Sequence, residues 1–504
     1  MRLYRVIKFN IQQFYKSTVG INSNRFSFIL LAERLALIKI LFVMNRKSFF
    51  KHLSVLGASF SIFARAAEAA KAKIGLAPKE KFEIEKKIFK LGKQSIKVKI
   101  PAQFKARLND FEFLLSRENM NFEKQEILTS TGDENYFVFD VEFKTEGRYT
   151  IFALDKTFKD KKKRNRPIAT LNMFAVADDL YALRPLKGDS HIHTTNSDGR
   201  DSPDAVALRC YEVGLDYQAI SDHRRWDTSD TIKKKYEKYG TSMSFYHAEE
   251  CHYAISHVQS FGATRCITSY IKENKAEIEN RVRKHILTLP KDMPSKLKIE
   301  VARVEVECQI INEFGGLSVL NHPYWMTARQ CFNMTDESVD AICARKNFDA
   351  YEFINFGCKD ISASLANAKY TELRIQGIDY PLIGATDAHM VKNQGYAYTI
   401  VFSKSDKWED VKQAILDKKS LAVCDTTYGE CAPESRERMI YGNRRLINYA
   451  HFLVREYFPK HDALVKEEGA ILAEIFKKGE SDELMAKLKK VSAQTEALWD
   501  SIRG

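Results

Sequence analysis

Histidines and carboxylates recur in short clusters between residues 191 and 389, and most clusters follow a brief apolar run. The first cluster, GDSHIHTTNSDG, places His191 and His193 two residues apart. On a strand, both imidazoles would face the same side and could share one metal ion. Later clusters are ISDHRRW, FYHAEECHYAISHVQSFG, LNHPYW and GATDAHM. The candidate metal ligands are His191, His193, Asp198, His223, Glu249, Glu250, His257, His322, Asp387 and His389.

This mixture of imidazole and carboxylate without thiolate is typical of a catalytic site with several metals, not of a structural zinc. Two ions held close together activate a shared water and clamp both oxygens of a displacement. The sequence therefore predicts ester hydrolysis, with a small phosphate ester as the favoured substrate. Arg224, Arg225 and Lys187 lie next to the clusters and could neutralise a phosphate, although ordinary surface charge explains them equally well.

Two other functions remain open at this point. The same metal-bound hydroxide could attack a carbamate or carboxylic ester instead of a phosphate ester. The alternative from a different class is a metal-binding module without turnover. The presence of every ligand type disfavours this last reading.

The pattern of apolar residues predicts three folded regions. Apolar residues alternate with polar ones over residues 80–183, which indicates a small immunoglobulin-like β domain. Short apolar runs then alternate with helical stretches over 186–428, which is typical of a parallel α/β sheet or barrel with reactive residues at the strand ends. Residues 434–504 show helical periodicity, and we expect them to pack against the barrel.

The motifs HIHTTNSDG, SDH, HVQSFG, GGLSVLNHP, FDAYEFIN and GATDAH, in this order, resemble the PHP (polymerase and histidinol phosphatase) superfamily. The flanking β domain and helical tail look like its CehA/McbA branch. The resemblance implies a distorted (β/α)7 PHP-type barrel that binds two or three divalent ions (Zn, Mn or Fe). It assigns His191, His193 and Asp387 to one metal, a bridging glutamate with His257 and His322 to a second, and Asp198, His223 and His389 to a third.

The bridging glutamate is ambiguous in this sequence. The family has Gly-x-Glu at the end of the third strand, whereas this chain has His247-Ala248-Glu249-Glu250. Alignment of Ala248 with the glycine favours Glu250, and alignment of His247 leaves Glu249 as the alternative. We expect Glu250, Asp387 and His193 to be the catalytic residues. Glu352, Asn355 and Asp222 are expected to orient ligands through hydrogen bonds.

The N-terminal residues resemble an export signal. Residues 44–69 contain a basic start, a short apolar stretch and small residues, and their Arg46-Lys47 pair before Phe49 resembles a twin-arginine signal peptide. We therefore expect contact with the export machinery, a bacterial periplasmic location and no transmembrane anchor; an amphipathic helix is the alternative for this segment. Residues 1–43 are interpreted as a non-native upstream extension, with a mitochondrial-type presequence as the competing interpretation.

The net charge of +13 is concentrated near the N-terminus. Residues 1–43 contain seven Lys/Arg and one acidic residue, residues 44–69 contain four and one, and the remaining chain therefore carries only +4. This distribution predicts a small-molecule substrate and no stable nucleic-acid partner. The nine cysteines form no C-x-x-C pair, although one bridge, such as Cys331–Cys343 or Cys424–Cys431, would be possible after export.

Overall fold

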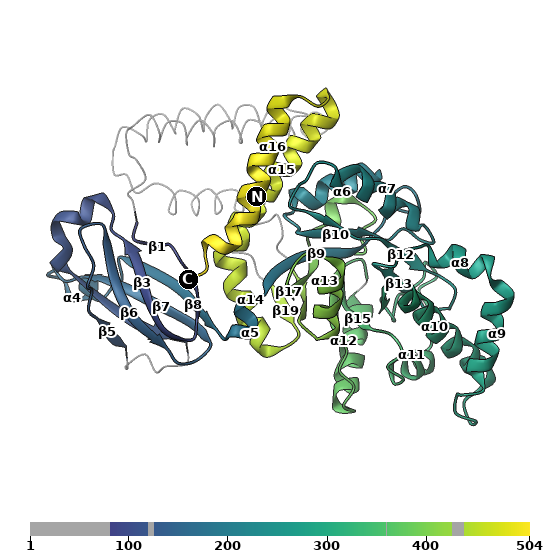
Figure 1. The fold of residues 1–504 in the computed structure, drawn as a ribbon. Helices are drawn as coiled ribbons and strands as arrows, with labels where there is room; N and C mark the ends of the chain where they lie inside the picture. The colour runs from purple at the N-terminus through teal and green to yellow at the C-terminus, as the bar shows by residue number, and fades with distance from the viewer. Residues whose placement is uncertain (1–80, 119–124, 359, 426–437) are drawn as a thin grey trace, which may run out of the picture. The chain divides into compact units, whose positions relative to one another are not determined.

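The computed structural model describes residues 81–118, 125–358, 360–425 and 438–504 (Figure 1). These residues belong to one compact unit, Lys81–Gly504. The predictions for residues 1–43 and 44–69 lie outside the described residues, as does Cys431, whereas Cys331 and Cys343 are both free thiols. Among the described helices, none combines the length and the apolar character that a membrane crossing requires.

Two sheets near the start of the described chain enclose one hydrophobic core. One contains, in spatial order, β1 (Glu83–Ile84), β3 (Gly92–Lys99) and β6 (Tyr136–Phe143). The other contains β2 (Ile88–Lys90), β8 (Ala169–Val176), β7 (Gly147–Asp155), β4 (Phe111–Arg117) and β5 (Glu126–Leu128). The predicted alternation is confirmed, because Val98, Phe139 and Ile151 are fully buried between solvent-facing neighbours. The immunoglobulin-like topology stays a prediction.

The region with the histidine clusters has a mixed α/β fold built on two further sheets. The six-stranded sheet has the order β11 (Ser244–Phe245), β10 (Tyr217–Ile220), β9 (Arg184–Ile192), β17 (Ala397–Ser403), β18 (Ser420–Cys424) and β19 (Met439–Tyr441). The five-stranded sheet has the order β12 (Ala248–Cys251), β13 (Val258–Phe261), β14 (Leu317–Leu320), β15 (Ala350–Asn355) and β16 (Leu382–Ala385).

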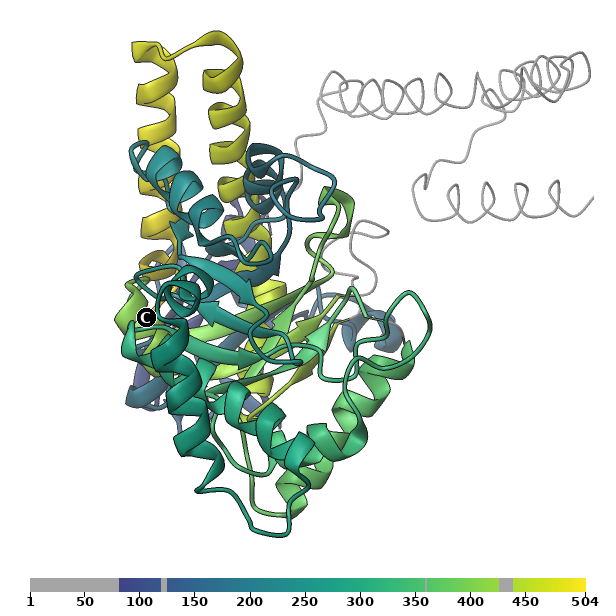
Figure 2. The ribbon, with the colours of Figure 1, turned by 90° about the vertical axis from the view of Figure 1, so that its right-hand side faces the viewer.

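Helices connect these strands, and Figure 2 shows them on the outside of the strands. They are α6 (Pro203–Glu212), α7 (Trp226–Glu237), α8 (Ile267–Glu273), α9 (Lys275–Ile286), α10 (Ser295–Glu313), α11 (Asp336–Cys343), α12 (Asp360–Ile375) and α13 (Trp408–Leu416). Strands β9 and β10 pair in parallel, as do β14, β15 and β16. The carboxyl ends of these strands can therefore place side chains at one edge.

Both sheets depart from the predicted parallel arrangement. In the six-stranded sheet, β17 pairs antiparallel with both β9 and β18. In the five-stranded sheet, β13 pairs antiparallel with both β12 and β14. Only residues 252–257 connect β12 to β13, and a parallel crossover needs a dozen residues or more. The reversal places the beginning of β13, and not its end, beside the carboxyl end of β12. His257, which directly precedes β13, thereby reaches the same edge as Glu250 in β12.

Two isolated bridges join the two sheets at this edge. Ile192 pairs with Ala388, and His223 pairs with Glu250, both in parallel orientation. The backbones that carry the candidate ligands are therefore held directly against one another. Closure of all these strands into a distorted (β/α)7 barrel stays a prediction.

The C-terminal region consists of α14 (Arg444–Glu456), α15 (Phe458–Lys478) and α16 (Asp482–Ser501), with α15 and α16 side by side (Figure 1). The predicted apolar face of α14 is buried in the same core as β9 and α6, which confirms the packing role. The sequence pattern missed α15 as a long separate helix. Pro459 ends the α14 periodicity but lies in the first turn of α15, where a missing backbone N–H is tolerated.

Candidate metal centre

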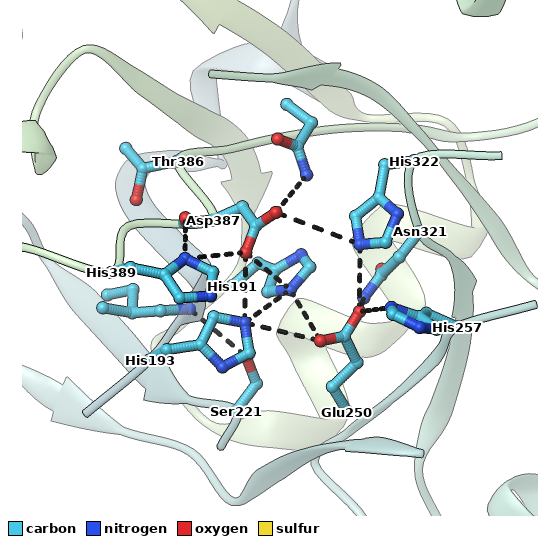
Figure 3. A network of polar contacts seen from close by, with 12 residues as sticks. His191, His193, Ser221, Glu250, His257, Asn321, His322, Thr386, Asp387 and His389 are labelled. Carbon is cyan, nitrogen blue, oxygen red and sulfur yellow. Dashed lines mark hydrogen bonds and ion pairs between the residues drawn. The ribbon is translucent and has the colours of Figure 1, made fainter. Parts of the chain in front are cut away.

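Side chains from six segments meet where the strands of the two sheets come together. Figure 3 shows the Glu250 carboxylate between two groups of imidazoles. The segments are the end of β9 (His191, His193), the residue after β10 (His223), strand β12 (Glu250), the residue before β13 (His257), the turn after β14 (His322) and the turn after β16 (Asp387, His389).

The first group surrounds one oxygen of Glu250. Its Oε2 atom lies 3.3 Å from His191 Nε2 and 3.4 Å from His193 Nε2. Asp387 Oδ1 lies 3.4 Å and 3.1 Å from the same two nitrogens, which are 3.1 Å apart. Two ligand atoms on one tetrahedral zinc ion, each about 2.0–2.1 Å from it, lie about 3.3 Å apart. These five separations match those of ligands around one ion.

The second group surrounds the other oxygen of Glu250. Its Oε1 atom lies 3.0 Å from His257 Nδ1 and 3.0 Å from His322 Nε2, and Asn321 Nδ2 donates to it over 3.1 Å. Glu250 is fully buried, and its Oε2 also lies 2.9 Å from His223 Nδ1. A fully buried carboxylate is costly unless positive charge neutralises it. Glu250 therefore fits a carboxylate that bridges two cations.

The third group is more open to solvent. Asp198 Oδ2 lies 3.4 Å from His223 Nε2 and 3.3 Å from His389 Nε2. The side chains of Asp198, His389 and His223 are 54%, 36% and 23% exposed, whereas that of Glu250 is 0% exposed. Gly199 lets the Asp198 loop pack closely against the chain at His193, since a Cβ there would lie 2.6 Å from the His193 backbone.

The buried carboxylates of the cluster require positive charge beside them. Burial would raise the pKa of Glu250, but the facing His191 and His257 hold it well below its usual range. Burial would likewise lower the pKa of His191, but Asp387 and Glu250 raise it well above its usual value. Burial opposes charge on His223, but hydrogen bonds with Asp198 and Glu250 raise its pKa to about 9. Protons on imidazoles thus balance the carboxylates without metal, and metal ions would displace them.

Two of the three residues expected to orient ligands, Glu352 and Asn355, contact candidate ligands, whereas Asp222 hydrogen-bonds to Thr194 and Ser197. Glu352 Oε1 lies 2.7 Å from His191 Nδ1, which leaves Nε2 of this ring directed into the first group. Asn355 Nδ2 donates to Glu352 over 3.0 Å and to Asp387 over 3.2 Å. Asp222 accepts hydrogen bonds from the backbone and hydroxyl of Thr194.

Three candidate residues lie elsewhere. Glu249 points to the other face of β12, where its carboxylate accepts backbone hydrogen bonds at the start of α8, so it does not join the metal groups. Arg225 is engaged with Asp227 through two contacts of 2.8 Å. Lys187 is buried and pairs with Asp462 over 2.6 Å, away from the candidate ligands.

Two residues at the site were missed from the sequence. His252 Nε2 lies 2.6 Å from His223 Nδ1, and burial together with the neighbouring His257 lowers the pKa of His252 to about 3. The Trp325 ring packs against His257 and His322, with centroids 5.4 Å and 6.2 Å apart. His252 could have been found from the sequence, because HAEECHYAISH places it close to two candidate ligands. No spacing rule identifies Trp325.

Comparison with known proteins gives only distant similarities. No family model matches the sequence, and no curated protein matches it. Similar solved structures include a two-domain protein from Bacteroides vulgatus with a predicted PHP-like metal-dependent phosphoesterase (16% identity, 48% of this chain and 65% of that chain, TM-score 0.32). Others are an amidohydrolase from Chromobacterium violaceum (12%, 40% and 87%, 0.28) and the lesion-specific endonuclease PfuEndoQ from Pyrococcus furiosus (17%, 46% and 56%, 0.28). These values are too low to assign the chain to a family.

Proposed function

We propose that this protein is a metal-dependent hydrolase of the PHP type that acts on small phosphate esters. One observation carries the proposal: the buried Glu250 carboxylate lies between His191 and His193 on one side and His257 and His322 on the other. All four contacts are 3.0–3.4 Å, the separations expected for ligands that share ions.

Divalent ions bound here would lower the pKa of a shared water and stabilise the charge that develops on the ester oxygens. The chain's own residues prepare this chemistry. Glu250 holds the two buried groups at a fixed separation, and Asp387 and His193 complete the first of them. Burial keeps bulk water from these side chains, which strengthens their electrostatic interactions. The partly exposed third group provides the side from which substrate can enter.

Arg224 supports a phosphate ester as substrate. Its side chain is exposed and makes no ion pair with the described residues, in contrast to Arg225. Its backbone N–H donates to the Glu250 carbonyl over 3.0 Å with φ at 59°, so its backbone is fixed beside the bridging ligand. A free guanidinium at this position can neutralise a phosphate oxygen.

The wider assignment rests on the motif order and on the N-terminal pattern. We propose a CehA/McbA-like arrangement with a β domain at 80–183, a PHP barrel at 186–428 and helices at 434–504. The two bridges between the sheets support the closed barrel. The basic and apolar pattern of residues 44–69 supports export to a bacterial periplasm.

A substrate panel tests the proposed function. The protein is stripped with chelator, reconstituted separately with Mn, Zn and Fe, and assayed on phosphomonoesters, phosphodiesters, naphthyl carbamates and carboxylic esters. We expect two or three ions per chain and turnover of a phosphate ester that chelator abolishes. Turnover of carbamates or carboxylic esters alone would select that class instead. Bound metal without turnover of any ester would indicate a binding module, and less than one ion per chain would refute the metal centre.

A further inference from the structure

Trp325 is a large aromatic side chain at the candidate metal centre, yet it belongs to none of the hydrophobic cores formed by the described residues. One side of its ring packs against the imidazoles of His257 and His322, with centroids 5.4 Å and 6.2 Å apart. The side chain is only partly buried, and no hydrogen bond from the part of the chain that the structure describes reaches its indole N–H. The indole N–H groups of Trp226 and Trp408, in contrast, donate to backbone carbonyls.

The backbone around Trp325 holds the indole in a fixed place. Its N–H donates to the His322 carbonyl over 2.8 Å, and the Asn333 N–H donates to the Trp325 carbonyl over 3.0 Å. Asn333 Nδ2 also donates to the Ile255 carbonyl over 2.6 Å, which ties this segment to the loop that delivers His257. The indole is therefore preorganised beside the second group, so that stacking on it requires little further ordering.

The surroundings of the second and third groups differ in polarity. Beside the third group, the side chains of Asp198 and Arg224 are charged and exposed. Beside the second group, the two loops that Asn333 joins expose large apolar side chains, because Ile255 and Phe332 are each 37% exposed. A substrate with a charged phosphoryl group at one end and an apolar group at the other fits this difference.

We propose that Trp325 is a specificity-determining residue that stacks on the leaving group of the substrate. The preferred substrates are then phosphate esters whose alcohol carries a planar aromatic ring. The inference rests on the proposed function and adds to it the class of leaving group. Hydrolysis of such a monoester consumes one water and releases inorganic phosphate and the ring-bearing alcohol.

The physical reason is the partly exposed face of the indole. A flat π system that covers this face removes apolar surface from water and gains an offset-stacked or edge-to-face contact. The free N–H also remains available to a polar atom at the edge of the bound ring. A short aliphatic alcohol has too little surface to replace these contacts.

Binding of phosphonates tests the inference without turnover. Benzylphosphonate has the shape of phenyl phosphate and ethylphosphonate has that of methyl phosphate, but neither has a P–O–C bond to hydrolyse. Calorimetry gives the Kd of both for the metal-loaded wild type, Trp325→Ala and Trp325→Phe. The control is Trp408→Phe, because the Trp408 ring packs against Phe261, with centroids 4.7 Å apart, and its N–H donates to the Gly315 carbonyl.

We expect the wild type and Trp408→Phe to bind benzylphosphonate about 10-fold more tightly than ethylphosphonate. Trp325→Ala should lose this preference while its affinity for ethylphosphonate and its metal content stay unchanged, and Trp325→Phe should keep most of the preference.

An unchanged preference in Trp325→Ala would overturn the inference. Equal weakening of both phosphonates, or loss of metal from Trp325→Ala, would also overturn it, because the indole would then only support the imidazoles. A wild type that binds both phosphonates equally refutes the inference and leaves the proposed function standing. A wild type that binds neither phosphonate and hydrolyses no phosphate ester refutes the proposed function itself.

Discussion

Substitution of Glu250 by glutamine tests which of the two adjacent glutamates in strand β12 is the proposed bridging ligand. The change removes one negative charge from a fully buried carboxylate with five imidazoles within 3.4 Å: His191, His193, His223, His257 and His322. Glutamine also places an amide N–H₂ where a ligand oxygen was, and this donor cannot bind a cation. Both buried groups therefore lose a charged ligand.

The magnitude follows from the number of ions affected. Loss of a residue that merely orients a ligand weakens metal binding about 10–100-fold, so loss of the bridging ligand should weaken each buried ion by at least about 100-fold. That factor corresponds to about 2.7 kcal/mol per ion. We expect Glu250→Gln to bind no ion in the first two groups at micromolar metal and to show no hydrolysis.

Glu249→Gln is the matched control. Its carboxylate accepts the backbone N–H groups of Ile267 and Thr268, and a glutamine oxygen can still accept one of them. We expect a loss of about 1 kcal/mol in unfolding free energy and unchanged metal content. Elemental analysis and equilibrium titration with a chelator measure both variants. If Glu249→Gln lost the ions and Glu250→Gln kept them, the bridging assignment would be wrong.

Two further predictions concern charge at the rim and in the core. Arg224→Ala should raise KM for phosphate esters several-fold without changing metal content. Arg225→Ala should leave KM unchanged, because Asp227 holds the Arg225 guanidinium. Equal effects of the two substitutions on KM would show that Arg224 does not bind the substrate. In the core, burial opposes charge on His461, but Asp216, 2.9 Å away, raises the pKa of His461 from 6.5 to about 9. Because the folded pKa is the higher one, the ion pair stabilises the fold fully below about pH 6.5, and this stabilisation is lost as pH rises through about 9. The difference in melting temperature between wild type and His461→Gln, measured without metal, should shrink over that range; a difference independent of pH would contradict the assignment.

Much of the site could be predicted from the sequence because its ligands follow strands. His191 and His193 share a face through the two-residue period of a strand, and the structure places their Nε2 atoms 3.1 Å apart. The same period explains why only one of Glu249 and Glu250 can join the cluster, but it does not determine which one. That choice depends on the tertiary position of β12 between β10 and β13, which no local pattern contains.

The features that were missed depend on contacts distant in sequence. The contact of His252 with His223 requires the loop after β12 to fold back beside the end of β10. The antiparallel direction of β13 could have been inferred, because the connection of residues 252–257 is too short for a parallel crossover. Alternating apolar runs indicated strands in the β domain correctly, whereas the separate helix α15 was hidden because Pro459 was interpreted only as a terminator.

Three residues at the candidate metal centre have strained backbone conformations. Asp387, Arg224 and His322 have φ values of 49°, 59° and 20°, which non-glycine residues rarely adopt. Each such residue costs on the order of 1–3 kcal/mol and persists only where the surroundings enforce it. Here the surroundings are hydrogen bonds between distant strands: Asp387 N–H donates to the His191 carbonyl over 2.8 Å, and Arg224 N–H donates to Glu250. These bonds require the assembled strands, so the ligand geometry depends on the folded tertiary structure. Ions at the two buried groups would therefore bind with full affinity only to the folded chain.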